Sequence, residues 1–319
     1  MKYAFIEGRK GEHPVSTLCR VLGVTFQGYY AWRGRPLSAR TEANLHLSAK
    51  IRVIHAESKE AYGSPRVRDE LLDQGVECGK HRVARLMHAE GLKAKAGRKF
   101  RVTTDSSHDK PVAPDLVQRD FRAKAPNVVW VGDITYLWTT EGWLYLAVFI
   151  DLYSRKVVGW ATGTRLQASL VTLAFARAVA RRRPAPGVIV HTDQGSQYAS
   201  SAFRRALADA QARQSMGSRG DCYDNAVAES FFHSFKIEAV YGSDIETRRE
   251  MEVEVFEYIE RFYNKKRKHS AIGLRSPEQF ENGETNNRKA AAYTINESGG
   301  RSIFVTDRPS VYSLYWVMN

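Results

Sequence analysis

The sequence predicts an α/β protein in which a mixed sheet with helices on its faces follows an all-α region. The sheet is indicated by two observations: strand-like and helical segments alternate over residues 126–240, and Val128–Tyr136 is rich in β-branched and aromatic residues. The all-α region is indicated by short amphipathic segments bounded by Gly and Pro before residue 93. A chain of 319 residues with 43% hydrophobic residues can form two or three globular domains.

The positive charge of the chain is concentrated in its first part. The net charge of the whole chain is +13, and residues 1–125 contain 24 Lys and Arg against 14 Asp and Glu. Residues 126–283 are nearly balanced, with 20 against 18. A basic N-terminal part is typical of nucleic-acid binding, and a solvated basic surface is the alternative interpretation.

Cysteine content and hydropathy exclude several classes of protein. The three cysteines, Cys19, Cys78 and Cys222, are far apart and form no C-x-x-C pair, so neither a disulfide framework nor a zinc module is expected. We expect a reducing compartment. No signal peptide is visible and no apolar run reaches ~18 residues, so no membrane span is expected.

Residues 1–35 are predicted to form a helix-turn-helix-like segment. One helix would run over Val15–Leu22, Gly23 would break it, and a second helix would start near Thr25. Residues 36–92 are predicted to form a second helical, DNA-binding unit.

The second unit is predicted to contain three helices. The first spans Thr41–Ser58, and the second opens at Ser64-Pro65 with Ser64 as its N-cap. The third, Lys80–Glu90, would bury Val83, Leu86 and Met87. It would direct three cations outward, as a recognition helix does: Lys80, Arg82 and Arg85. A solvated face on an ordinary helical bundle is the alternative.

Residues 93–125 are basic and contain prolines, and we expect a linker that follows DNA phosphates. Strands are then predicted at Val128–Trp138, Trp143–Asp151, Lys156–Ala161, Val188–Thr192 and Arg213–Met216. Helices are predicted at Leu166–Arg183, 200–211, Asp224–Val240 and 247–264. The first two strands should form a hairpin. Four tryptophans are interpreted as core residues rather than base-stacking platforms: Trp130, Trp138, Trp143 and Trp160.

Three carboxylates stand out by their positions. Asp133 lies inside a strand on the same face as Val129 and Val131, where a carboxylate is costly unless a cation compensates it. Asp193 follows a buried strand, and Glu229 lies in a helix. Oxygen ligands without a nearby thiolate or His cluster suit Mg²⁺ or Mn²⁺. Two such ions about 3.5–4 Å apart would act on a phosphodiester.

The patterns leave alternatives open. Asp151 also ends a strand and rivals the three carboxylates, and Asp221 and Asp224 lie close enough to Glu229 in sequence to be the third ligand. Lys236 returns to nearly the same helix face as Glu229, where it could hold a phosphate or simply face solvent.

Further polar residues are candidates for DNA contacts. Gln197 either contacts DNA or braces the loop of Asp193. The basic run that follows the acidic helix is expected to contact phosphates: Lys265, Lys266, Arg267 and Lys268.

Three segments closely resemble the catalytic protein of the insertion-sequence-three transposases, which belong to the DDE, retroviral-integrase-like superfamily. They are Val131–Tyr136, His191–Tyr198 and Asp224–Lys236. Between Asp193 and Glu229 lie 35 residues, the hallmark spacing of that superfamily, and 59 lie between Asp133 and Asp193.

Further motifs extend the resemblance from about residue 1 to residue 283. They are Tyr62–Arg66, Ile150–Arg155 and His269–Phe280. Residues 284–319 have no counterpart in that family, and whether this atypical tail folds or is disordered stays open.

The resemblance implies an RNase H-like core with a mixed five-stranded sheet, in which Asp133, Asp193 and Glu229 bind two Mg²⁺ ions, with Mn²⁺ as a substitute. It implies a DDE polynucleotidyl transferase that cleaves the ends of an insertion sequence and transfers them to target DNA. Water and then a DNA 3′-hydroxyl would be the nucleophiles. The expected location is the bacterial cytoplasm, at the nucleoid.

The resemblance also implies partners. DNA is one, both as element ends and as target, and a homo-oligomer on DNA is another. The chain starts with Met1 and has no leucine-zipper heptad, so it is similar to the second-reading-frame product of the family. We therefore expect the first-reading-frame product as a partner or fusion. The end sequence and the target preference cannot be predicted.

Two other functions remain as alternatives. One is a catalytically silent DNA-binding protein that represses or competes at element ends. The other is an RNase H-like nuclease that acts on RNA–DNA hybrids. The intact set of three carboxylates favours the transposase.

Overall fold

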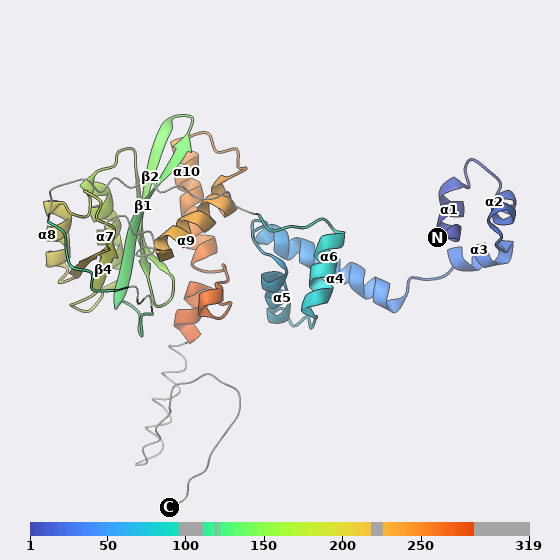
Figure 1. Ribbon diagram of the computed structural model, residues 1–319, viewed down its shortest axis with the longest axis horizontal. Helices are drawn as coiled ribbons and strands as arrows, with labels where there is room; N and C mark the ends of the chain where they lie inside the picture. Colours follow the sequence, from blue (N-terminus) through green and yellow to red (C-terminus); the bar gives the residue numbers. More distant parts are fainter. Residues whose placement is uncertain (96–110, 119, 121, 218–225, 284–319) are drawn as a thin grey trace, which may run out of the picture. The chain divides into compact units, whose positions relative to one another are not determined.

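The computed structural model describes residues 1–95, 111–118, 120, 122–217 and 226–283, and it divides into two compact units, Met1–Ala96 and Gly97–Asn319 (Figure 1). The predicted tail 284–319, the helix cap at Asp224, and Asp221 and Cys222 lie outside the described residues.

The first three helices confirm the predicted helix-turn-helix spacing. They are α1 (Lys2–Arg9), α2 (Val15–Leu22) and α3 (Phe26–Arg33). Gly23 ends α2 with a φ of 61°, a left-handed conformation that glycine adopts without strain. The Thr25 side chain caps α3 by accepting the N–H of Gly28 at 3.1 Å.

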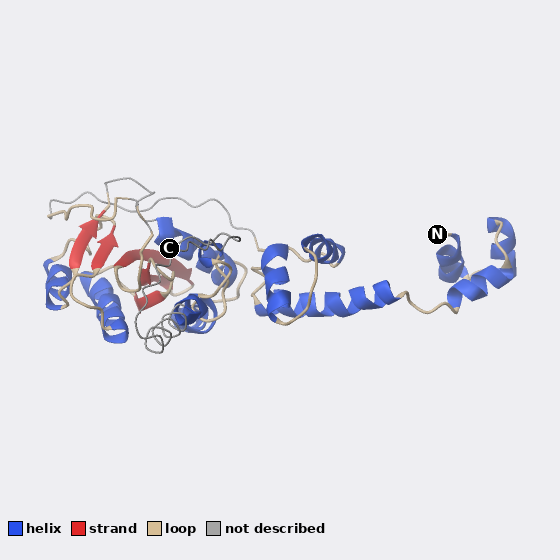
Figure 2. Cartoon of the chain, turned by 90° about the horizontal axis from the view of Figure 1, so that it is seen from below, coloured by secondary structure: helices blue, strands red, loops and turns tan. Residues whose placement is uncertain are grey.

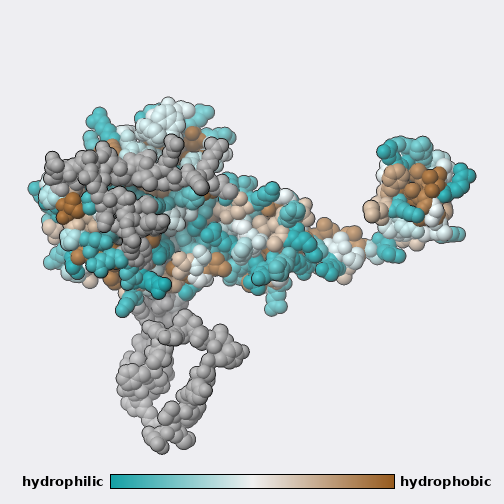
Figure 3. Space-filling model, in the orientation of Figure 1, coloured by the Kyte–Doolittle hydropathy of each residue, from teal (hydrophilic) through white to brown (hydrophobic). Residues whose placement is uncertain are grey.

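These three helices enclose a small core of Ile6, Leu18, Cys19 and Tyr29. Hydrophobic side chains also gather on the face of this bundle seen in Figure 3. The exposed apolar residues of the bundle include Phe5, Val21, Phe26 and Tyr30.

Three further helices complete the first unit. They are α4 (Ala39–Glu57), α5 (Ser64–Asp73) and α6 (Lys80–Ala89). Val83, Leu86 and Met87 are buried as predicted. The prediction of Ser64 as N-cap is wrong by one residue, because Gly63 is the N-cap of α5 and Ser64 is already helical.

The second unit contains the predicted mixed five-stranded sheet, with strand order β3-β2-β1-β4-β5. Its strands are β1 (Val129–Thr139), β2 (Gly142–Asp151), β3 (Val157–Gly163), β4 (Ile189–Thr192) and β5 (Arg213–Met216). β1, β2 and β3 form an antiparallel meander, whereas β4 and β5 run parallel to β1. This is the predicted RNase H-like arrangement.

Helices cover both faces of the sheet (Figure 2). On one face, α7 (Ala168–Arg182) and α8 (Ser201–Asp209) pack over a core that includes Trp130 and Phe149. On the other face, α9 (Ala226–Phe235) and α10 (Arg248–Phe256) pack on β1 and β2.

The last helices differ in kind from the prediction. α9 continues as a π-helix, η2 (Lys236–Val240), and α10 continues as a second π-helix, η3 (Glu257–Tyr263). A 3₁₀ turn, η4 (Ser270–Ile272), follows. No helix among the described residues is long and apolar enough to cross a membrane.

Two predictions about packing need correction. Trp138 and Trp143 are not core residues: 60% and 45% of their surfaces are exposed, because the β1–β2 hairpin extends beyond the helices. Part of the predicted linker also packs on the sheet domain, since the N–H of Leu116 donates to Ser215 Oγ in β5 at 2.9 Å.

Candidate active site

β1 brings Asp133 to the centre of the sheet. Val131 and Thr135, which share its face by alternation, are buried as expected. Gly132 leaves room for the ring of Phe149, the residue opposite it on β2, since a Cβ at this position would lie 2.4 Å from that ring. Oδ1 of Asp133 accepts the N–H of Ile134 at 2.7 Å, which orients the carboxylate.

The strand register brings Asp193 beside Asp133. β1 and β4 are parallel, and Gly132 lies opposite Thr192, the last residue of β4. The next residues in the two segments are Asp133 and Asp193, so both lie where β4 ends, at the edge of a sheet where parallel strands present ligands. Asp193 Oδ1 accepts the N–H of Gly195 at 3.0 Å, which forms a turn.

Helix α9 carries the third carboxylate. The helix packs on β1 and β2, and its buried side chains are Ala228, Phe231, Phe232 and Phe235. Glu229 lies in the first turn and is half-buried. Burial raises the pKa of the Glu229 carboxyl group above its usual value.

The pKa of Asp133 is influenced by the charges of both other carboxylates. Burial is the main reason why the pKa of Asp133 is well above its usual value, and the negative charge of Asp193 raises it further. The N–H of Ile134 opposes this shift, whereas the charge of Glu229 adds to it. Within the described ranges, no group of three His, Cys, Asp or Glu side chains is arranged as a ready-made metal site.

Lys236 brings a cation to this carboxylate cluster. It is the first residue of the π-helix η2 and is half-buried. Burial lowers the pKa of Lys236, and the charge of Asp133 acts in the opposite direction. Lys236 was expected either to hold a phosphate beside the carboxylates or to face solvent. The influence of Asp133 on its pKa agrees with the first interpretation.

Tyr198 is a core residue whose pKa responds to the charges of both aspartates, although the sequence did not single out its side chain. It is fully buried, and its hydroxyl has no hydrogen-bond partner among the residues that the structure describes. Burial, followed by the charges of Asp133 and Asp193, raises the pKa of Tyr198 well above its usual value. The only feature of the sequence that could have indicated this is the position of Tyr198 in the same segment as Asp193.

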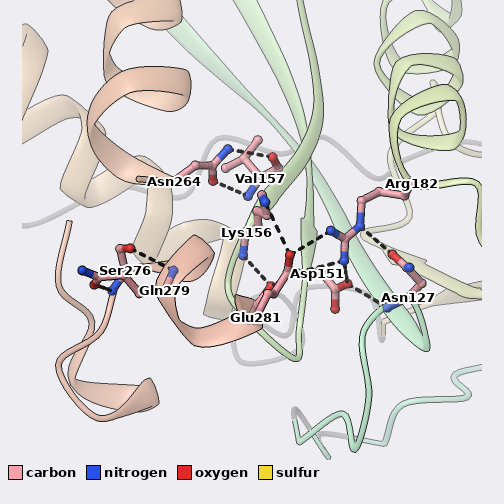
Figure 4. Close-up of polar contacts among 10 residues, drawn as sticks. Asn127, Asp151, Lys156, Val157, Arg182, Asn264, Ser276, Gln279 and Glu281 are labelled. Atoms are coloured by element: carbon pink, nitrogen blue, oxygen red, sulfur yellow. Dashed lines mark hydrogen bonds and ion pairs between the residues drawn. The ribbon is translucent and has the colours of Figure 1, made fainter. Parts of the chain in front are cut away.

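Asp151, the rival carboxylate, has a structural role (Figure 4). Its side chain is fully buried and accepts the N–H groups of Asn127 at 2.8 Å and Tyr153 at 3.0 Å. Arg182 forms ion pairs with both Asp151, at 3.3 Å, and Glu281, at 2.8 Å. Through Arg182, Asp151 therefore links the end of β2 to α7 and to the segment that carries Glu281.

The predicted phosphate contact of Arg267 is wrong. Only 5% of Arg267 is exposed, and its guanidinium donates to Glu238 at 2.7 and 2.8 Å and to Ser234 at 3.0 Å. The guanidinium of Arg267 therefore neutralises the buried carboxylate of Glu238 inside the fold. The predicted phosphate contact of Lys268 is also wrong, because only 2% of this residue is exposed. Lys265 and Lys266 are exposed, as a phosphate contact requires.

The other predicted DNA contacts lie in two places. Lys80 and Arg85 on α6 are exposed, whereas Arg82 is half-buried and donates to Asn44 Oδ1 at 2.9 Å. Gln197 is half-buried in the loop that follows Asp193.

Three protein-family models match the chain, and two of them describe an integrase core domain. The integrase core domain matches residues 123–222 and residues 229–284, and an HTH-like domain matches residues 42–100. The integrase core matches therefore include Asp133, Asp193 and Glu229.

Named relatives cover most of the chain. Transposase InsF for insertion sequence IS3A of Escherichia coli (strain K12) is 45% identical over 284 residues, which is 88% of this chain and 99% of the relative. The insertion element IS600 uncharacterized 31 kDa protein of Shigella sonnei is 41% identical over 263 residues, 82% of this chain and 97% of the relative.

The solved structures with a similar chain include an intasome and an integrase catalytic core domain. The simian T-cell lymphotropic virus intasome in complex with PP2A regulatory subunit B56 gamma gives a TM-score of 0.43 at 15% identity, over 77% of this chain and 76% of that one. The HTLV-2 integrase catalytic core domain in complex with magnesium gives 0.39 at 15% identity, over 50% and 99%.

The similarity to InsF extends over nearly the whole of that relative. It therefore includes both the HTH-like domain and the integrase core domain that follows it. The chain belongs to the IS3 family of transposases, with an HTH-like domain followed by an integrase core domain.

Proposed function

We propose that Asp133, Asp193 and Glu229 are the catalytic carboxylates with which this transposase cuts DNA at the ends of an insertion sequence and joins them to target DNA. The observation that carries the proposal is the convergence of charge on Asp133. The register of β1 and β4 brings Asp193 beside it, and the charges of Asp193 and Glu229 both raise its pKa.

The donor chemistry fits a hard divalent cation. Three carboxylates that repel one another are stabilised when a cation binds between them. The set contains oxygen donors and no thiolate, which suits Mg²⁺, with Mn²⁺ as a substitute, and we propose two ions held by these three side chains. When bound, the metal would supply a Lewis acid for attack on a phosphodiester by water or by a DNA 3′-hydroxyl.

Other side chains would hold the DNA. The ammonium group of Lys236 lies in the field of Asp133, where it can pair with a phosphate of the strand that is cut. Lys265 and Lys266 are exposed on the same unit, and Gln197 belongs to the loop of Asp193. We propose that Lys80, Arg82 and Arg85 on α6 contact duplex DNA through the HTH-like domain.

The assembly proposed for this chain is a homo-oligomer on paired DNA ends that acts in the bacterial cytoplasm, at the nucleoid. The product of the first reading frame would join it as a partner or a fusion. The family membership supports this arrangement.

The test is Asp193→Asn in the full chain. DNA that carries the ends of the element should bind to the variant as it does to wild type, because the amide keeps the size of the side chain. Mg²⁺-dependent strand transfer should fall by about 10³-fold or more, since a metal ligand is lost. Asp209→Asn on the exposed end of α8 is the matched control and should leave both properties unchanged. Full strand transfer by Asp193→Asn would contradict the proposal.

A further inference from the structure

A buried ion pair lies beside the segment that carries Lys236. The guanidinium of Arg267 donates to both carboxylate oxygens of Glu238, at distances of 2.7, 2.8 and 3.1 Å. The hydroxyl of Tyr258 donates to Glu238 Oε2 at 2.7 Å. Arg267 Nη2 also donates to Ser234 Oγ at 3.0 Å. We call Ser234, Glu238, Tyr258 and Arg267 the Arg267 cluster.

The Arg267 cluster fixes geometry more than it adds stability. Glu238, Tyr258 and Arg267 are all buried. Burying two charges is costly, and an apolar set of similar volume often gives at least the same stability. A bidentate pair of an arginine and a carboxylate, however, has one good arrangement, because both groups are planar and their hydrogen bonds are directional. The geometry that the cluster imposes is therefore a stronger reason for it than stability is.

The Arg267 cluster contacts the chain on both sides of Lys236. Ser234 lies two residues before Lys236, in the last turn of α9, and Glu238 lies two residues after it, in η2. One guanidinium therefore joins the end of the α-helix to the π-helix. Because two residues turn a helix by about half a circle, Ser234 and Glu238 lie on the side of the helix opposite Lys236.

The helix changes type at Lys236. η2 begins at this residue, and the carbonyl of Lys236 accepts the N–H of Tyr241, five residues later, at 2.7 Å. π-Helical turns are rare and occur frequently at functional sites. Tyr258 and Arg267 lie 20 and 29 residues after Glu238 in the sequence. The turn is therefore fixed by tertiary contacts as well as by its own backbone.

Lys236 lies on the side of the helix that carries the third carboxylate. It follows Glu229 by seven residues, which returns it to nearly the same helix face. α9 packs on β1, the strand of Asp133. The mutual influence of the charges of Lys236 and Asp133 agrees with this placement. At such a position a displacement of about 1 Å can lower a rate by about 10²-fold.

We propose that the Arg267 cluster positions Lys236 beside the three carboxylates of the proposed active site, and that strand transfer depends on the cluster through Lys236. This inference rests on the proposed function. It assigns a role to the buried arginine of the basic run after η3. Arg267 acts on DNA through a second cation, which it holds in place from the opposite side of the helix.

The experiment is a double-mutant cycle on Mg²⁺-dependent strand transfer by the full chain at saturating end-carrying DNA. Ser234→Ala removes one acceptor of Arg267 but leaves the buried ion pair, and it should lower the rate by about fivefold. Glu238→Gln keeps the size of the side chain but removes its charge, and it should lower the rate by about tenfold. In a Lys236→Gln background each substitution should lower the rate by less than about twofold, because the residue through which it acts is already lost.

Two serine variants are matched controls. Ser234→Thr keeps the hydroxyl and should retain the wild-type rate. Ser243 lies exposed beyond the other end of η2, where its hydroxyl donates to the carbonyl of Val240 at 2.6 Å, and Ser243→Ala should also retain the rate. Urea unfolding of each variant measures its stability. A variant that is only partly folded would lose the same factor in both backgrounds.

Three outcomes would overturn the inference. Equal losses in the Lys236 and Lys236→Gln backgrounds would assign the Arg267 cluster to stability alone. A wild-type rate in both Ser234→Ala and Glu238→Gln, or in Lys236→Gln itself, would also contradict it. If Glu238→Gln does not fold, the contrast between Ser234→Ala and Ser234→Thr decides. Failure of the proposed function is a separate result, because it would appear as full strand transfer by Asp193→Asn.

Discussion

Two clusters of carboxylates include one aspartate each from paired strands, Asp133 on β1 and Asp151 on β2, and the two clusters are compensated in opposite ways. In the catalytic cluster, Asp133 is surrounded by the negative charges of Asp193 and Glu229. In the structural cluster of Figure 4, Asp151 and Glu281 share the guanidinium of Arg182, and further N–H groups donate to Asp151.

Burial alone does not separate the two groups. It is the first cause that raises the pKa of both Asp133 and Asp151. The difference lies in what surrounds each carboxylate, since nearby anions raise the pKa of Asp133 further while Arg182 and two N–H groups oppose the shift at Asp151. A buried carboxylate that the fold leaves poorly compensated is a candidate for binding a cation.

The largest expected effect is a difference in stability between the alanine variants of Asp151 and Asp133. Asp151→Ala leaves two buried N–H groups without an acceptor and should lower the free energy of unfolding by about 3 kcal/mol. Asp133→Ala removes a charge that its surroundings disfavour, so the metal-free unfolding free energy should stay within about 1 kcal/mol of wild type.

Urea unfolding of both variants in EDTA measures this contrast. Strand transfer should be lost in Asp133→Ala although the protein is stable. Equal destabilisation by the two substitutions would show that the two clusters do not differ in the way argued above.

The next effect concerns Lys236, the cation near the catalytic cluster. Lys236→Gln should lower strand transfer by about 10–100-fold, because a phosphate contact beside the carboxylates is lost. Lys266→Gln, an exposed lysine of the same unit, should change it by less than about threefold. The measurement is the initial rate of strand transfer at saturating DNA. Equal effects of the two substitutions would assign Lys236 to general attraction of DNA.

The smallest effect is a pH dependence of the structural cluster. Burial raises the pKa of Glu281, but hydrogen bonds and charges from Arg182, Ser154 and Lys156 outweigh it, and the pKa lies below the usual 4.5. The folded state therefore binds fewer protons than the unfolded state, so the contribution of Glu281 is present above pH 4.5 and is lost as the pH falls through the folded pKa.

Urea unfolding between pH 3 and 6 tests this contribution. Glu281→Gln should be less stable than wild type near pH 6, and the difference should shrink toward pH 3. A difference that is constant over this range would contradict the assignment.

Much of the site could be predicted from the sequence because it depends on local periodicity. Two-residue alternation gave the face of Asp133, and the end of a short buried strand gave the position of Asp193. Of the structural cluster, the sequence analysis named only Asp151, and it named it as an alternative metal ligand. Its partners, Arg182 and Glu281, come from segments far away in sequence, so no local pattern could assign its role.

The predictions that failed depend on packing between distant elements. A run of four cations looks solvated, but Arg267 is neutralised by Glu238, which lies 29 residues earlier and meets it only in the folded core. Trp138 was interpreted as a core residue because aromatic residues in strands are usually buried. The sequence could not predict that α7 does not extend over the hairpin tip (Figure 1), and the exposure of Trp138 follows from that.

The most direct test of the central claim is the position of manganese in crystals of the full chain bound to DNA. Anomalous scattering from Mn²⁺ should give peaks within coordination distance of the carboxylates of Asp133, Asp193 and Glu229, and none at the structural cluster of Asp151 and Glu281. Manganese bound only at the structural cluster, or a Glu229 carboxylate directed away from both aspartates, would contradict the account.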